Sequence, residues 1–262
     1  MIMTRIITII FEVVCKSHIN QKFKATAFAL ATILFVGCSN DDNSSSPDYN
    51  LQPGLYSGEL INDAVGGSSS ILAIVTKNNN IRIMLSSLSG QVSGGLVMSG
   101  GSFTGTLSLF QTQIANFFHT KTDIIEFETN RTIDGNINAT WTTDTTYGRI
   151  YLNILSAQLA TPQLAEATWL VNLGSSSGAT LTLSLTINVN GEITGSDTNS
   201  CVFNGGFVGA DSAGEIEFEL TSCGILDGIY TGAAILRSVA GNEKLIILAS
   251  NELYSFSTEL SK

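Results

Sequence analysis

The stretch TLTLSLTINV, residues 180–189, alternates polar side chains with leucine, isoleucine or valine along its whole length. Successive side chains of an extended chain point to opposite faces, so this period of two predicts a β-strand with one buried face and one wetted face. Asn190-Gly191 follows directly, and this dipeptide favours a hairpin because a type I′ turn needs positive φ at both central residues. The segment therefore predicts an antiparallel sheet.

Short runs of β-branched and aromatic residues recur on both sides of this segment, separated by Gly, Asn, Asp and Ser. This is the pattern of many short strands joined by tight turns. Only three prolines are present, and no stretch has a convincing helical period, so we expect an all-β protein. The predicted strands span residues 71–76, 81–85, 103–110, 124–129, 133–142, 150–155, 168–173, 179–189, 192–195, 201–208, 215–221, 229–236, 244–249 and 253–260.

A partial internal repeat relates the two halves. The segment GLYSG at 54–58 corresponds to GIYTG at 228–232, and at the same offset ILAIV at 71–75 falls on LIILA at 245–249. A second echo pairs GSFTG at 101–105 with GEITG at 191–195. The two echoes come in a different order in each half, so we expect a shifted arrangement of strands, not simple tandem copying.

The boundary between the halves is predicted in the segment LATPQ, residues 159–163. It leaves an N-terminal β domain, 51–160, and a C-terminal β domain, 163–262, each of the usual domain size. Each would supply about seven or eight strands, and antiparallel sets of that size close into barrels or form sandwiches that hide their edges. We expect two compact β-barrel or β-sandwich domains, with a single intertwined β structure as the alternative.

The first fifty residues have a different composition. Lys22 and Lys24 precede an uncharged stretch, 25–37, that ends in Gly37 and runs into Cys38. A basic start, an apolar stretch and a small residue before the cut are the features of a secretory signal. The apolar stretch is shorter than the roughly 20 residues that span a bilayer. Residues 1–37 are therefore predicted to be a signal peptide.

The junction Leu34-Phe35-Val36-Gly37-Cys38 resembles the lipobox of bacterial lipoproteins, with Phe35 where leucine is usual. The resemblance implies a diacylglycerol on Cys38. Because Ser39 follows, it also implies a location at the outer membrane of the cell envelope, on either the periplasmic or the surface face. Several acyl chains together give stable anchoring. Residues 38–50 would be the lipidated cysteine and a flexible tether, because this polar segment cannot bury enough surface to order itself.

The second half also resembles small bacterial envelope domains of the META type. The resemblance is carried by Trp169, by NGEITG at 190–195 and by CVFNG at 201–205. It implies a non-catalytic envelope protein.

Charge and cysteine content narrow the possible functions. Removal of the leader leaves 8 basic and 21 acidic residues, a formal net charge of −13, which argues against nucleic-acid binding because that needs clustered Lys and Arg. Once the leader is cut and Cys38 is lipidated, only Cys201 and Cys223 remain. In an exported protein such a pair is expected to form a disulfide. The alternative, a metal site, lacks partners, because His119 is the only histidine of the mature chain and lies far from both cysteines in the sequence.

No residue pattern indicates catalysis. His119 lies in a predicted turn, and no Gly-x-Ser-x-Gly elbow is present. Three glutamates, Glu215, Glu217 and Glu219, alternate with apolar residues and are expected on a solvated strand face. The carboxylates of Asp123, Glu126 and Glu128 are interpreted in the same way.

Two further segments have rival interpretations. Residues 188–192, NVNGE, are superficially like part of a calcium loop but lack its 12-residue framework, so a hairpin is expected. The aromatic residues Phe117, Phe118, Tyr147 and Tyr151 could line the mouth of a lipocalin-like barrel, although barrels of eight strands are often filled by their own side chains.

We expect a non-catalytic, membrane-anchored envelope lipoprotein with a structural or interaction role, without cofactor or metal, whose partner would be another envelope protein. The alternative is a carrier of a small apolar ligand or an enzyme inhibitor that uses a β-barrel, and the carrier requires a pocket of at least roughly 300 Å³. A hydrolase is the third possibility, and it depends on His119.

Overall fold

The computed structural model describes residues 51–85, 89–99, 101–115, 117–129, 135–174, 180–208 and 214–262. These residues are almost entirely β-strand, which confirms the predicted all-β class. The exceptions are one helical turn, α2 (Pro162–Ala165), and a 3₁₀ turn, η2 (Gly224–Leu226). The predicted signal peptide, the tether and Cys38 lie outside the described residues. By its contacts, the segment Tyr49–Lys262 forms one compact unit.

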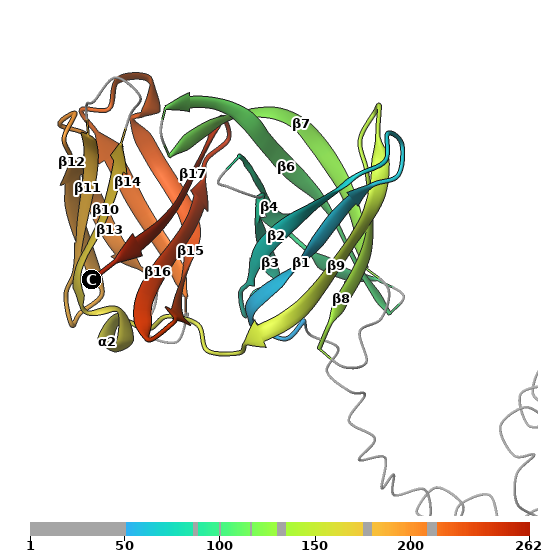
Figure 1. Cartoon of the computed structure of the whole chain (residues 1–262), viewed down its shortest axis with the longest axis horizontal. Helices are drawn as coiled ribbons and strands as arrows, with labels where there is room; N and C mark the ends of the chain where they lie inside the picture. The colour runs from blue at the N-terminus through green and yellow to red at the C-terminus, as the bar shows by residue number, and fades with distance from the viewer. Residues whose placement is uncertain are drawn as a thin grey trace, which may run out of the picture. The chain divides into compact units, whose positions relative to one another are not determined.

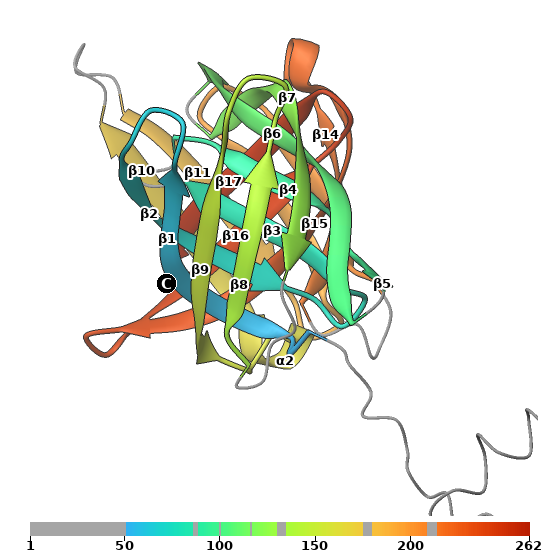
Figure 2. The same ribbon diagram turned by 90° about the vertical axis from the view of Figure 1, so that its right-hand side faces the viewer.

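The first half of this unit is a closed ring of eight antiparallel strands, drawn from blue to yellow-green in Figures 1 and 2. Each strand pairs with the next and β9 returns to β1. A short strand, β5 (Val97–Ser99), pairs with the start of β6. The ring strands are β1 (Gly54–Asn62), β2 (Ser68–Val75), β3 (Asn80–Leu85), β4 (Gln91–Gly95), β6 (Ser102–Ala115), β7 (Phe118–Thr129), β8 (Ile137–Thr142) and β9 (Tyr147–Ser156).

The second half forms another ring of eight antiparallel strands, drawn from yellow to red in Figure 1. Each strand again pairs with the next, and β17 returns to β10 through the residue pair Leu170 and Ser261. The strands are β10 (Ala167–Gly174), β11 (Thr180–Ile187), β12 (Glu192–Asp197), β13 (Val202–Phe207), β14 (Glu215–Thr221), β15 (Gly228–Val239), β16 (Asn242–Ser250) and β17 (Tyr254–Ser261).

The predicted strands recur with shifted ends. β14 has the predicted bounds, whereas β1, β4 and β5 were not among the predicted strands; QVSGG in β4 and VMS in β5 are too short to give an alternating signal. The predicted boundary at 159–163 falls on the link from β9 through α2 to β10. The division into two separate domains stays a prediction.

Large buried side chains fill both rings. In β11 the residues Leu181, Leu183, Leu185 and Ile187 all face the core of the second ring, as the alternation at 180–189 predicts. Trp169, Tyr230, Phe203 and Phe256 occupy the same core and are at most 2% exposed. The first ring has a comparable core around Tyr56, Ile83 and Trp141. Small antiparallel barrels are commonly packed in this way.

The internal repeat marks the surface through which the rings pack together. In β2, Ile71, Ala73 and Val75 face the first core, while Leu72 and Ile74 point outward into a third apolar cluster. The repeated segment in β16 does the same, with Leu245, Ile247 and Ala249 inside and Ile246 and Leu248 outside. The outward residues of both repeats belong to one shared cluster. The continuous apolar runs are therefore strands that are buried on both faces.

The repeat also preserves a local backbone motif. The hydroxyl of Tyr56 donates to the carbonyl oxygen of Gln52, and that of Tyr230 donates to the carbonyl oxygen of Leu226, four residues upstream in each case. Gly228 precedes the second tyrosine with a φ of +143°, a conformation that favours glycine. Burial raises the pKa of Tyr56 to about 12. Each motif fixes the chain at the start of its strand, β1 or β15.

The two echoes relate different positions in the rings. The GxYxG repeat relates the first strand of one ring, β1, to the sixth of the other, β15, whereas the GxxTG echo relates the fifth strand, β6, to the third, β12. The first echo fits the expected shifted arrangement of strands. A single circular shift does not account for both echoes.

One hairpin crosses from the first ring to the second. The start of β7 pairs with β17, with Phe118 opposite Phe256, His119 opposite Ser255 and Thr120 opposite Tyr254. Phe117 and Phe118 are 2% and 3% exposed and belong to the core of the second ring. A strand of the first half therefore completes part of the wall of the second ring, at the top of Figure 1.

No helix within the described ranges is both long enough and apolar enough to cross a membrane.

Candidate functional site

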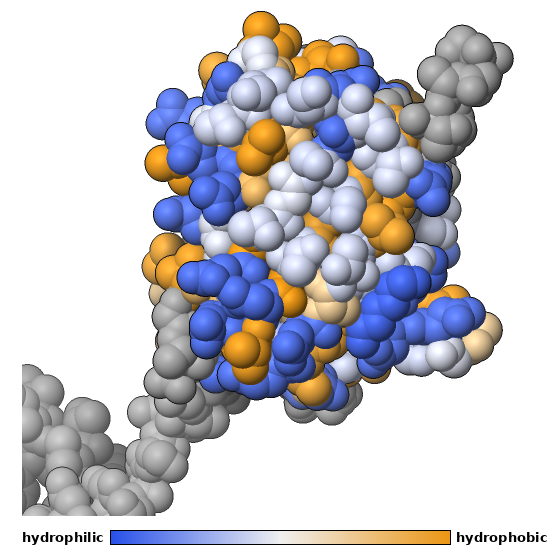
Figure 3. Space-filling view, turned by 90° about the vertical axis from the view of Figure 1, so that its left-hand side faces the viewer, coloured by the Kyte–Doolittle hydropathy of each residue, from blue (hydrophilic) through white to orange (hydrophobic). Residues whose placement is uncertain are grey.

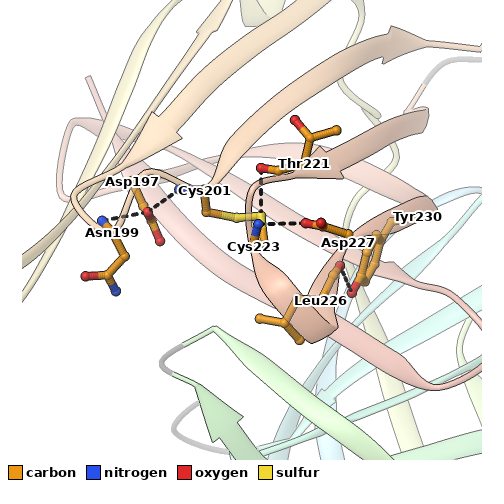
Figure 4. The surroundings of a disulfide bond; sticks show 8 residues. All are labelled: Asp197, Asn199, Cys201, Thr221, Cys223, Leu226, Asp227 and Tyr230. Carbon is orange, nitrogen blue, oxygen red and sulfur yellow. Dashed lines mark hydrogen bonds between the residues drawn. A yellow bond between two sulfur atoms is a disulfide. The ribbon is translucent and has the colours of Figure 1, made fainter.

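Cys201 and Cys223 form the predicted disulfide, with their Cα atoms 4.5 Å apart. It joins the start of β13 to the turn that follows β14 (Figure 4). The carboxylate of Asp197 accepts the backbone N–H of Cys201 at 3.0 Å, and that of Asp227 accepts the N–H of Cys223 at 2.6 Å. Aspartate side chains thus hold both cysteines at one end of the second ring, where the disulfide links β13 to β14 covalently.

The prediction of a turn or surface position for His119 is wrong. The side chain is 1% exposed and lies on β7, where the strand pairs with β17. The sequence signal for β7 begins at Ile124, but the strand begins at Phe118 because its first residues pair with the other half of the chain. A long-range pairing of this kind leaves no local pattern.

The predicted aromatic mouth is also wrong. Phe117 and Phe118 pack in the core of the second ring, whereas Tyr147 and Tyr151 lie on β9 of the first ring and are 55% and 37% exposed. Tyr151 is instead part of a surface group in which Arg149 donates to its hydroxyl and to the carboxylate of Asp63. The hydrogen bond from Arg149 to the carboxylate of Asp63 lowers the pKa of Asp63.

The carboxylates on β14 and β7 largely lie where the alternation places them. Glu217 and Glu219 are exposed and Glu215 is half-buried, while Glu126 and Glu128 on β7 are exposed. Within the described ranges, no group of three or more His, Cys, Asp and Glu residues could hold a metal ion.

The segment 188–192 forms the expected hairpin. The side-chain oxygen of Asn188 accepts the N–H groups of Asn190 and Glu192, both at 3.0 Å. Gly191 has positive φ, at +82°, but Asn190 does not, so the hairpin forms without the expected type I′ turn. The asparagine oxygen is thus occupied by the turn itself.

The candidate functional site is a groove of about 960 Å³ between the two rings, which we call the inter-ring groove. The first ring contributes residues of β3, β4, β6 and β7, and the second ring contributes residues of β14, β15, β16 and the loop before β17. Gly95 is exposed in its wall, and the absence of a side chain there leaves the groove open above Asn80. The principal polar lining residues are Asn80, Arg82, Ser93, Lys121, Glu215, Glu217, Thr231, Ser250 and Glu252.

Arg82 is the buried charge of this groove. It is 9% exposed, and its guanidinium donates to Ser250 Oγ at 2.9 Å and to Thr231 Oγ1 at 3.5 Å. Ser250 Oγ is also 2.9 Å from Ser93 Oγ, so both rings meet in one polar network. Burial lowers the pKa of Arg82 to about 10, and the nearby charge of Glu215 offsets this only in part. No carboxylate of the described segments forms an ion pair with it.

Strand register explains how these side chains come together. Ile74, Arg82 and Ser93 are paired across β2, β3 and β4, so all three face outward from the first ring. Thr231 and Ser250 are paired across β15 and β16 on the outer face of the second ring. Ile74 packs in the apolar cluster between the rings. Because Arg82 is its neighbour across the strands, this packing places Arg82 beside the hydroxyl groups of Ser250 and Thr231.

Glu215 forms the second part of the network. Its carboxylate accepts hydrogen bonds from Asn78 Nδ2 at 2.9 Å and Asn80 Nδ2 at 3.4 Å, both from the first ring. The alternation at residues 215–219 predicts a solvated face for Glu215, and no local motif predicts the role of Arg82. One signal was present: Arg82 is a lone charge in the apolar run IRIML, residues 81–85.

Two other depressions are less specific. A groove of about 1000 Å³ lies over β1, β2 and β9 of the first ring, and Arg237 of the second ring contributes to it. A small pocket of about 210 Å³ lies beside the disulfide and is lined partly by Phe117, Phe118 and Leu226. It is smaller than the pockets that usually hold small molecules, roughly 300 Å³ or more.

The outer face of the second ring is mainly polar. Figure 3 shows this face largely in blue and pale colours, with hydrophobic residues scattered among them. Thr186 and Thr194 are exposed and paired across β11 and β12, and Thr168 Oγ1 lies 3.1 Å from Thr186 Oγ1. These hydroxyls fit a solvated surface.

We found no match to this chain among known protein families, curated proteins or solved structures. The resemblances to bacterial lipoproteins and to META-type envelope domains therefore stay predictions.

Proposed function

We propose that this protein is a non-catalytic, lipid-anchored protein of the cell envelope, and that it binds a partner or ligand in the inter-ring groove. The lipobox-like junction at Cys38, the polar tether and the acidic composition support the location. The observation that carries the binding role is Arg82, a buried cation that faces the groove without an ion-pair partner among the described side chains. Burial of an unpaired charge is costly, so a binding role accounts for its presence.

The packing of the rings favours the groove over the ring interiors. Aromatic and aliphatic side chains fill both cores, and a carrier of apolar ligands needs a cavity of roughly 300 Å³ or more. Recognition by the outer surface is therefore the better supported form of the proposal. An inhibitor that engages an enzyme through the same groove is compatible with it.

The anchor is tested by labelling cells with an alkyne analogue of palmitate. The wild-type protein is expected to incorporate the label and to sediment with membranes, and Cys38→Ser is expected to lose both properties. Equal labelling of both proteins would contradict the anchor.

The groove is tested by capture from envelope extracts. Gly95→Trp fills the groove, and the added Cβ contacts only the end of the Asn80 side chain, at 3.2 Å. Thr140→Trp, on the exposed face of β8, is the matched control. We expect the wild type and the control to capture the same molecule and Gly95→Trp to lose it. Retention of that molecule by Gly95→Trp would contradict the proposal.

A further inference from the structure

Arg82 is held in place by hydroxyl groups, and the nearby charge of Glu215 compensates it only in part. Two hydroxyl oxygens accept from its terminal nitrogens, and its Nε has no hydrogen-bond partner within the described part of the chain. Hydroxyl groups orient a guanidinium without supplying a counter-charge. An arginine has five N–H donors in a planar fork that fits a carboxylate or phosphate. The enclosed Nε is not available to a ligand, but an anion in the groove would add to the partial compensation that Glu215 gives to the guanidinium.

The acidic side chains of the same groove restrict which anion fits. Glu215, Glu217 and Glu252 line it, against Lys121 and Arg82 as its cations. A dianionic phosphate would be repelled by three carboxylates, because like charges at short range destabilise one another. A single carboxylate bound at Arg82 is tolerated better. The glutamates then favour ammonium or hydroxyl groups elsewhere on the ligand.

The shape of the site agrees with a small polar ligand. Ser93, Ser250 and Thr231 provide hydroxyls beside the guanidinium, and Gly95 leaves space next to Asn80. None of the described residues that line the groove is aromatic, so none of them offers a ring to stack on an apolar ligand. The lining is suited to hydrogen bonding.

We propose that the inter-ring groove binds small molecules that present one carboxylate to Arg82 and hydrogen-bond donors, ammonium or hydroxyl, to the surrounding glutamates. The inference rests on the proposed binding role of the groove and specifies its ligand chemistry. A peptide terminus and an acidic sugar both carry these groups.

The experiment is calorimetric titration of the full chain, purified in detergent, with defined probes. Trialanine is compared with its C-terminal amide, and galacturonic acid with its methyl ester, so that each pair differs in the carboxylate alone. Inorganic phosphate is titrated in parallel. The variants are Arg82→Gln and the matched control Arg237→Gln, which removes an arginine from the other groove.

We expect at least one of the two acids to bind with a dissociation constant below about 1 mM. Masking its carboxylate should weaken binding about 10- to 100-fold, the usual range for a charge-assisted hydrogen bond. In Arg82→Gln, the affinity for the acid should fall to that of the masked form. In Arg237→Gln, the affinity for the acid should be unchanged. Which acid binds distinguishes a peptide from a sugar source.

Three results would overturn the assignment: no binding of either acid, equal binding of acid and masked form by the wild type, or phosphate binding at least as tight as that of the acids. All three comparisons use the wild type alone, so they hold even where Arg82→Gln does not fold. If these probes fail while Gly95→Trp still abolishes capture from envelope extracts, the ligand chemistry is wrong and the groove remains the binding site.

Discussion

Replacement of Phe118 by alanine is expected to destabilise the second ring, although the residue lies in the first half of the sequence. Phe118 is 3% exposed, and its ring centroid lies 5.2 Å from that of Phe256 and 6.2 Å from that of Tyr230. Truncation of a buried phenylalanine costs about 3–5 kcal/mol, because apolar contacts are lost and a cavity remains. That is a large share of the roughly 5–15 kcal/mol that stabilises a typical protein.

The two tryptophans make the prediction specific to one ring. Trp141 packs in the first core and Trp169 in the second. In a Trp141→Phe background, the fluorescence of Trp169 reports unfolding of the second ring during a urea titration. With a slope of about 1–3 kcal/mol per M, the loss of about 3–5 kcal/mol in Phe118→Ala should lower the midpoint by about 1–5 M.

Ile124→Ala is the matched control, since Ile124 lies on the same strand but is 47% exposed. Such a surface change should alter the free energy of unfolding by less than about 0.5 kcal/mol. A Trp169 transition that is unaffected by Phe118→Ala would refute the insertion of the β6–β7 hairpin into the second ring.

Three further changes have expected outcomes. Replacement of both Cys201 and Cys223 by serine should cost about 3 kcal/mol in urea unfolding, the chain-entropy value for a loop of this length; an unchanged midpoint would argue against a structural role. Gly58→Ala should largely prevent folding, judged by circular dichroism, because its Cβ would lie 1.7 Å from a carbonyl oxygen of β9; a native spectrum would contradict this close approach. Burial raises the pKa of Tyr56 to about 12 and also raises that of Tyr230. The stabilisation from keeping both phenols neutral is therefore complete below about pH 10. It is lost as the pH rises through the folded-state pKa values. Ultraviolet titration should show these two phenols ionising last, and simultaneous ionisation of all tyrosines at pH 10 in the folded protein would be inconsistent with their burial.

The sequence predicts the features of this fold that arise from local patterns. The alternation at 180–189 identifies β11 and its inward face, Asn190-Gly191 identifies the next hairpin, and the two mature cysteines identify the disulfide. Short or glycine-rich strands such as β4 give no such pattern. The position of Phe117 and Phe118 depends on pairing between β7 and β17, which are far apart in the sequence.

The inter-ring groove was not predictable because it exists only when the rings pack together. The apolar runs at 71–75 and 245–249 contain one clue, since a strand without alternation is often buried on both faces. That clue indicates a partner surface but does not identify it. The contact of Arg82 with Ser250 and Thr231 depends on the packing of the outer faces of β2 and β16.

Recognition in the inter-ring groove is tested most directly by photocrosslinking in living cells. A photoreactive amino acid replaces Leu253, which lines the groove and is 61% exposed. In the control protein it replaces Val65, which is 77% exposed in the turn between β1 and β2. We predict a covalent adduct of defined mass from position 253 that is absent from position 65 and disappears when Gly95→Trp is added. An adduct that is equally strong from both positions, or that persists in Gly95→Trp, would contradict binding in the groove.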